Sequence, residues 1–138
     1  MPGRSESRPD RRRVPRGGRR AGDVPGKFPP VLVADSDDGA RRPCVRYLER
    51  FGFQVEQATT GEAAAAIVEQ CRPQVAVAEL TLPRDDAFQR LLQTRGIPYI
   101  ATASTDNPIV PSGVAAVLFK PFPLEALLAD VRRVLRSR

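Results

Sequence analysis

Three charged side chains directly follow apolar runs of strand length: Asp35, Glu79 and Lys120. The run before Glu79, residues 75–78, consists of valine and alanine and lies between two prolines. Such a run is typical of a strand that is buried on both faces of a parallel sheet. Open α/β sheets carry their sites at the carboxyl ends of their strands. Two carboxylates and an ammonium are therefore expected at the catalytic or binding edge of such a sheet, with Glu79 as the first candidate.

Lys120 is unusual in its chemical type. It is the only lysine in residues 28–138, where the other 12 basic residues are arginine. An ammonium is a point charge on a flexible stem and differs from the planar guanidinium fork. The sequence contains no histidine, which excludes histidine-dependent catalysis, histidine–metal sites and phosphohistidine intermediates. Its two cysteines, Cys44 and Cys71, are interpreted as small residues on helix faces.

The elements that position these residues alternate between strand and helix patterns. Strands are predicted over residues 31–35, 53–56 (at a sheet edge), 75–79, 97–103 and 114–119. A helix is predicted up to Arg50, with a late or distorted first turn at Pro43, an apolar face that includes Phe51, and an end at Gly52. A second helix opens at Thr60, and its inward face comprises Ala63, Ala64, Ile67, Val68 and Cys71.

Two further helices are predicted in the second half of the chain. A short one contains Phe88, Leu91 and Leu92. The last begins at Pro123, and its amphipathic stripe comprises Leu124, Leu127, Leu128, Val131 and Leu135. Two prolines within residues 104–112 leave room for at most one helical turn there.

Strands that alternate with helices require right-handed crossovers and a parallel sheet. The predicted fold class is therefore α/β, in one domain that covers residues 28–138. The first strand would lie inside the sheet. Its carboxyl end would bring Asp35 to the same rim as Glu79, Lys120 and either Thr102 or Ala103.

The basic character of the sequence comes from its first 27 residues. They hold nine basic and three acidic side chains, a net charge of +6, whereas the rest of the chain is neutral. This segment is rich in Arg, Pro, Gly and Ser, and we predict that it is a disordered tail. It lacks the apolar core of a secretory signal, and no apolar run elsewhere is long enough to span a membrane. A cytoplasmic protein is expected.

Four segments of the sequence resemble the receiver domain of bacterial two-component response regulators. They are VLVADSDD at 31–38, VAVAELTLPRDDA at 75–87, IPYIATA at 97–103 and GVAAVLFKPFPLEALL at 113–128. The resemblance implies a doubly wound, flavodoxin-like fold with strand order 2-1-3-4-5 and a cis peptide bond before Pro121. It also implies a role in phosphorelay signal transduction, as a protein that is not an enzyme and whose partners are proteins of a signalling pathway.

The family's functional residues transfer only in part. Asp35 matches the first acid of the pair that holds Mg²⁺, but Ser36 stands where the second acid is expected, and Asp37 is the candidate replacement. Glu79 occupies the position of the phospho-accepting aspartate, and Lys120 matches the lysine that pairs with the phosphoryl group. The hydroxyl residue at the end of the fourth strand falls on Ala103 by spacing, or on Thr102 if the Thr-Ala pair is matched.

These departures predict weak or absent phosphotransfer. Glutamate displaces the carboxylate by one methylene, and a misplacement of about 1 Å can cost roughly 10²-fold in rate. Serine removes an oxygen ligand from Mg²⁺, so Asp35 and Glu79 would form at most a weak metal site and no cofactor is expected. We hypothesise a pseudo-receiver in which Glu79 contacts Lys120 directly. Such a domain would act without phosphorylation and through protein–protein interaction. The alternative is a receiver that is phosphorylated weakly on Glu79.

Two other interpretations remain open. Asp35-Ser36-Asp37 after a strand is similar to the nucleophile motif of haloacid-dehalogenase-type phosphatases, with Thr102 and Lys120 as later partners. Such an enzyme needs a further acidic pair after the lysine to bind Mg²⁺. In this chain, only one amphipathic helix follows Lys120. The second interpretation is a nucleic-acid-associated protein that is anchored by residues 1–27. Such binding would be sequence-independent and steeply salt-dependent.

Overall fold

The structure, a computed structural model, describes residues 30–105 and 108–137. The predicted tail at residues 1–27 lies outside the described residues. The elements are β1 (Val31–Ala34), α1 (Asp38–Arg50), β2 (Val55–Ala58), α2 (Gly61–Cys71), β3 (Val75–Glu79), α3 (Asp86–Arg95), β4 (Tyr99–Ala103), β5 (Val114–Phe119) and α4 (Leu124–Arg136).

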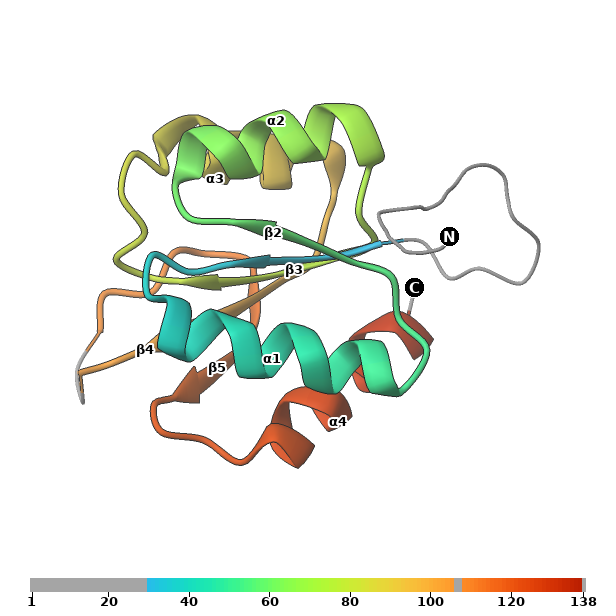
Figure 1. Cartoon of the computed structure of the whole chain (residues 1–138). Helices are drawn as coiled ribbons and strands as arrows, with labels where there is room; N and C mark the ends of the chain where they lie inside the picture. Colours follow the sequence, from blue (N-terminus) through green and yellow to red (C-terminus); the bar gives the residue numbers. More distant parts are fainter. Residues whose placement is uncertain (1–29, 106–107, 138) are drawn as a thin grey trace.

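The five strands form one parallel sheet in the order β2-β1-β3-β4-β5, which confirms the predicted topology. Helices α1 and α4 lie on one face of the sheet, and α2 and α3 lie on the other (Figure 1). β2 is an edge strand, as predicted, but it covers residues 55–58 and not 53–56. None of the helices in the described part of the chain is long and apolar enough to cross a membrane.

Each face of the sheet has its own apolar core, because side chains alternate along a strand. In β1, Val31 and Val33 join the core beneath α1 and α4, whereas Leu32 and Ala34 join the core beneath α2 and α3. All residues of β1, β3 and β4 are buried, as expected for strands covered on both faces. The two layers therefore hold the carboxyl ends of these strands rigidly at one rim.

Local capping sets where the helices begin and end. Thr60 is the N-cap of α2, and its hydroxyl accepts a hydrogen bond from the Ala63 amide at 3.1 Å. Gly52, with φ of 94°, follows α1 and confirms the predicted helix end. Pro43 lies inside α1, which nevertheless begins at Asp38 directly after its N-cap, so the prediction of a late first turn was wrong.

Three further sequence-based assignments need correction. Ala63 was expected to face inward but is exposed, because the buried stripe of α2 passes through Ala64 and Val68. Phe51 was placed on the buried face of α1, but it is the C-cap residue and 43% of its surface is exposed. Pro123 is the N-cap of α4 and not its first helical residue.

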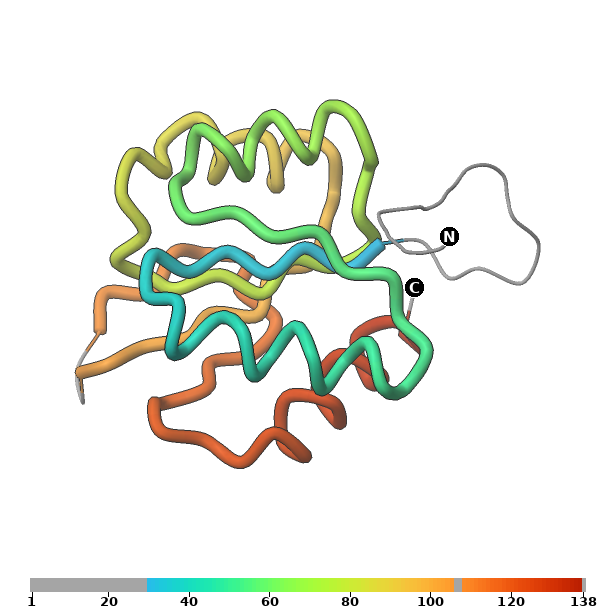
Figure 2. Tube along the Cα trace, viewed as in Figure 1, coloured from blue at the N-terminus to red at the C-terminus, as the bar shows by residue number. Residues whose placement is uncertain are grey.

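The described residues between β4 and β5 contain no helix, which confirms that the fourth helix of the family pattern is shortened or missing. The tube view shows this connection as an irregular loop at the β4–β5 edge (Figure 2). As a consequence, β5 is poorly covered, with Ala115 and Phe119 exposed.

Candidate functional site

The candidate site lies at the carboxyl ends of β1, β3 and β5. Asp35 directly follows β1, Glu79 ends β3, and Lys120 directly follows β5. Backbone hydrogen bonds continue the ladder past the strands: the Asp35 amide donates to the Ala58 carbonyl at 3.0 Å, and the Lys120 amide donates to the Ala103 carbonyl at 2.8 Å. The sheet thus brings the two carboxylates and the ammonium together.

Lys120 bridges the two acids unequally. Its Nζ donates a hydrogen bond to Asp35 Oδ2 at 2.7 Å and lies 3.8 Å from Glu79 Oε2. The Asp35 and Glu79 side chains are only 7% and 9% exposed, and Lys120 is 21% exposed. The expected contact between Glu79 and Lys120 is present as an ion pair, but the hydrogen bond of Lys120 belongs to Asp35.

Ser36 explains why Glu79 does not turn fully toward Lys120. The amide and the hydroxyl of Ser36 both donate to Glu79 Oε1, at 2.7 Å and 2.6 Å. The other oxygen, Oε2, accepts a longer bond from the Thr81 hydroxyl at 3.5 Å. A hydrogen bond from a neutral donor to an ionised carboxylate is about twice as strong as one between neutral groups. Ser36 therefore positions the glutamate, a role that sequence reasoning missed because it treated Ser36 only as a lost acid.

Asp37 does not join this pocket as a replacement acid. It is the N-cap of α1, its Oδ1 accepts a hydrogen bond from the Gly39 amide at 3.1 Å, and it is exposed. This role satisfies an amide of the first helical turn that would otherwise lack a partner. The Asp37 amide in turn donates to Asp35 Oδ1 at 2.8 Å. Asp37 thus supports Asp35 through its backbone, and its carboxylate points to its own helix.

Arg41 is a second residue that sequence reasoning missed. It is buried on α1, and its guanidinium donates to the Asp35 carbonyl at 3.0 Å, to Gln57 at 2.9 Å and to Asp38 at 2.6 Å. These bonds tie the helix to the ends of β1 and β2. A signal was present in the sequence, because Arg41 lies three residues before Cys44 on the buried face of the helix.

Thr102 and Ala103 take different places at the end of β4. Thr102 pairs in register with Glu79, but its buried hydroxyl makes no hydrogen bond within the described residues. Ala103 contributes its carbonyl to the Lys120 amide and has no hydroxyl to offer. In the described rim, no hydroxyl group from β4 hydrogen-bonds to the carboxylates or the ammonium. The peptide bond between Lys120 and Pro121 is cis, as the resemblance implied.

The rim does not fit the magnesium ion that the family implies. The described residues contain no group of three or more Asp, Glu, Cys or His side chains that could hold a metal. Each carboxylate oxygen of Asp35 and Glu79 already has a partner: Asp37 and Lys120 for Asp35, and Ser36 and Thr81 for Glu79. A metal ion would have to displace these donors, and Mg²⁺ requires near-octahedral oxygen ligation.

Cys44 packs in the core near this rim. Burial raises the pKa of its thiol to about 11, and the negative charge of Asp35 adds to the rise. Both cysteines are free in the structure, and Cys44 is buried in the core beneath α1 and α4. The thiol is therefore neutral near pH 7 and acts as a small apolar residue.

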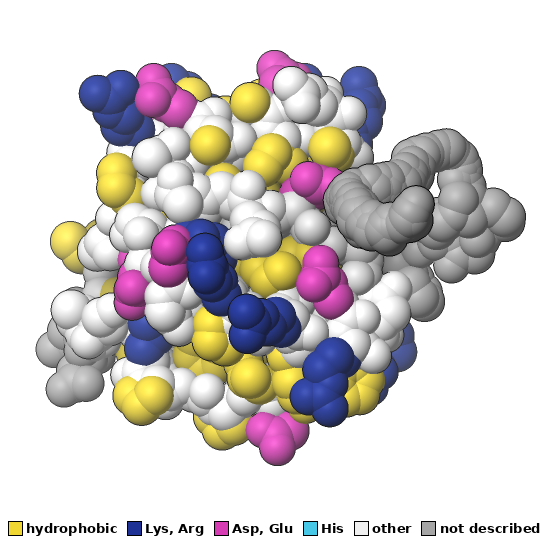
Figure 3. All heavy atoms as spheres, in the orientation of Figure 1, with side chains coloured by type: hydrophobic (Ala, Val, Ile, Leu, Met, Phe, Trp, Pro, Cys, Tyr) yellow, Lys and Arg dark blue, Asp and Glu magenta, His cyan; other side chains and the backbone are white. Residues whose placement is uncertain are grey.

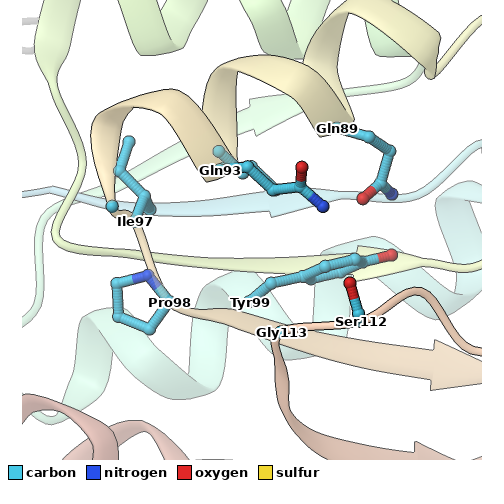
Figure 4. A pocket seen from close by; sticks show the side chains of 9 residues that line it. Gln89, Gln93, Ile97, Pro98, Tyr99, Ser112 and Gly113 are labelled. Atoms are coloured by element: carbon cyan, nitrogen blue, oxygen red, sulfur yellow. The ribbon is translucent and has the colours of Figure 1, made fainter.

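A separate cavity of about 420 Å³ lies at the opposite ends of the strands. Figure 4 shows Tyr99 between the side chains of α3 and the loop at Ser112 and Gly113. The Tyr99 hydroxyl is buried without completing a hydrogen bond, and burial raises its pKa to about 12. The cavity opens where no helix covers the β4–β5 edge, so it belongs to the shortened connection and not to the rim.

Comparison with known proteins agrees with this fold. No protein-family model matches the chain. The response regulator MprA of Mycobacterium tuberculosis is 32% identical over 115 residues, which cover 77% of this chain and 50% of that protein. The chain thus spans about half the length of the curated relatives it matches.

Solved structures show the same architecture. The receiver domain of Francisella response regulator 1452 has a TM-score of 0.70 at 23% identity and covers 80% of this chain and 100% of its own. Chemotaxis response regulator CheY4 of Vibrio cholerae has a TM-score of 0.66 at 24% identity, and the match covers 78% of this chain and 99% of CheY4. The strand order and helix layers define a doubly wound domain of the CheY type. Together with the likeness to MprA, they show that this chain carries a response-regulator receiver domain, the domain of two-component signalling.

Proposed function

We propose that this receiver domain is a pseudo-receiver, which acts in signalling through protein–protein contacts and without phosphorylation of Glu79. It is a binding protein and not an enzyme. The observation that carries the proposal is the closed set of contacts at the rim. Lys120 holds Asp35, Ser36 holds Glu79, and the two acids are buried.

Phosphoryl transfer to a carboxylate depends on positioning and on neutralisation of the transferred group's oxygens. Either carboxylate oxygen of Glu79 could attack, and both already have neighbours. Oε1 accepts two hydrogen bonds from Ser36, and Oε2 lies beside Lys120 and Thr81. The lysine that would neutralise a phosphoryl group is hydrogen-bonded to Asp35. Both groups would have to leave existing partners, which adds a barrier to the roughly 10²-fold cost of a misplaced carboxylate.

The rim also suggests what takes the place of phosphorylation in this domain. Lys120 lies within ion-pair distance of both acids, so the charge that a phosphoryl group would bring is supplied in part by the longer side chain of Glu79. The partners of such a domain are other proteins of the pathway, and the curated relatives are named as response regulators. The nucleic-acid association of residues 1–27 stays a separate proposal, because that segment lies outside the described residues.

Incubation with acetyl phosphate and Mg²⁺, followed by intact mass measurement, tests the proposal. We expect no phosphoryl adduct on the native chain. The matched variant is Ser36→Asp with Glu79→Asp, which restores both acids of the family pattern and should give a hydroxylamine-labile adduct. An acyl phosphate on Glu79 of the native chain would refute the pseudo-receiver and support the weakly phosphorylated receiver instead.

A further inference from the structure

Five arginines gather on the side of the sheet that α1 and α4 cover. They are Arg42, Arg46 and Arg50 on α1, with Arg132 and Arg136 on α4, and all five are exposed. This set is called the arginine face below. Residues 28–138 are neutral in sum, so these charges are concentrated on one side of the domain and are not part of a general excess.

The arginine face is continuous across the two helices. The three arginines of α1 are spaced by four residues, which puts them on one side of the helix at steps of about 6 Å. Figure 3 shows basic side chains in a diagonal row over the face that α1 covers. The α4 residues join this row at the end of α1, because the Arg132 guanidinium lies 5.4 Å from the centre of the Phe51 ring.

Most of these arginines have no acidic partner. Within the described residues, Arg46, Arg50, Arg132 and Arg136 form no ion pair. Arg42 has one contact, at 3.9 Å to Asp38, and such a contact between side chains that are 62% exposed is worth little.

The acids nearest in sequence do not pair with the arginine face. Asp130 on α4 is paired with Arg133 at 2.9 Å. Glu49 on α1 is exposed, and within the described residues it forms no ion pair with any of these arginines. The arginine face therefore keeps its positive charge.

The first strand, β1, begins at the end of the molecule where α1 and α4 end (Figures 1 and 2). At this end, the Val31 amide donates a hydrogen bond to the carbonyl of Gln54, which follows α1. The 27 residues that open the chain carry a net charge of +6. The sequence before β1 is thus basic, and β1 itself begins at the Arg50 and Arg136 end of the face.

We infer that the arginine face binds the phosphate backbone of a nucleic acid, without reading its bases. Guanidinium groups suit phosphates because their planar donors can bond two oxygens at once. A regular row of exposed arginines, most of them without an acidic partner, is complementary in charge and spacing to a row of phosphates. This inference does not depend on whether Glu79 is phosphorylated, since the face and the rim use different residues.

The test is binding of the full chain to a fluorescent duplex DNA of arbitrary sequence over a series of salt concentrations. The variant Arg42→Gln, Arg46→Gln and Arg50→Gln removes three charges from the face. The control Arg72→Gln, Arg84→Gln and Arg90→Gln removes three exposed arginines from the α2–α3 side. Circular dichroism should show that both variants remain folded, because all six side chains are exposed.

The slope of log K against log salt is negative, and we expect its magnitude to be smaller by about 2.7 in the face variant. This corresponds to about 0.9 for each phosphate that is no longer neutralised. The control should retain the slope and the affinity of the native chain. Equal reductions in the two variants, or an unchanged slope in the face variant, would overturn the inference. Displacement of the labelled DNA by poly-glutamate at a lower charge concentration than by unlabelled duplex DNA would also overturn it, because the site would then prefer carboxylates to phosphates.

Discussion

The ammonium of Lys120 is hydrogen-bonded to Asp35 at 2.7 Å, closer than its 3.8 Å approach to Glu79. Replacement by methionine, in Lys120→Met, would leave two buried carboxylates without their cation. An unpaired buried charge is strongly destabilising, and with Lys120 partly exposed we expect a loss of about 2 kcal/mol. Urea unfolding at neutral pH measures this loss.

The control for this prediction is the double variant Lys120→Met with Asp35→Asn. It removes one of the two uncompensated charges, so it should recover part of the stability that the single variant loses. If both variants unfold at the same urea concentration as the native chain, Lys120 does not stabilise the acids.

Arg41→Lys tests the clamp between α1 and the end of β1. Lysine keeps the positive charge but cannot reach the Asp35 carbonyl, Gln57 and Asp38 together. We expect a loss of about 2 kcal/mol, the usual range for a hydrogen bond that involves a charged group. The neighbour Arg42→Lys is the control and should change the unfolding free energy little, because Arg42 is exposed.

Thr102→Val tests whether the strand-four hydroxyl contributes to the rim. The Thr102 hydroxyl is buried without a partner in the described structure, so its removal should leave stability unchanged or raise it by up to about 1 kcal/mol. Thr60→Ala removes a hydroxyl that caps α2 and should cost about 1 kcal/mol. A destabilised Thr102→Val protein would show that its hydroxyl has a partner in solution.

Gly61→Ala tests the packing of the β3–α3 loop that follows Glu79. A Cβ at this position would lie 2.0 Å from the Arg84 carbonyl oxygen, so the loop would have to move. We expect a cost of about 2 kcal/mol from this overpacking, seen as a lower melting temperature. Gly39→Ala, whose Cβ would lie 3.6 Å from Asp37, should instead be neutral or slightly stabilising.

The residue pattern was sufficient to predict a parallel sheet and the convergence of Asp35, Glu79 and Lys120, and the resemblance to receiver domains supplied the strand order. Each of these residues stands at the end of an apolar run, and parallel strands place such ends at one rim. The absence of a helix from the described residues between β4 and β5 was also predictable, because proline restricts the backbone locally.

The hydrogen bonds inside the rim were not predictable. Ser36 can be a lost ligand or a donor to Glu79, and only the backbone path after β1 decides between them. Asp37 likewise could cap or coordinate, and the position of α1 determined its role. Net charge was also uninformative, since a neutral domain can still place five exposed arginines on one face.

The most direct test of the account is titration of the native chain with Mg²⁺, followed by amide NMR. If the carboxylate oxygens are held by Lys120, Ser36 and their neighbours, the Asp35, Ser36, Glu79 and Lys120 amides should not shift up to tens of millimolar Mg²⁺. The Ser36→Asp, Glu79→Asp variant should show saturable shifts at the same positions. Saturable, millimolar binding that moves these amides in the native chain would contradict the account.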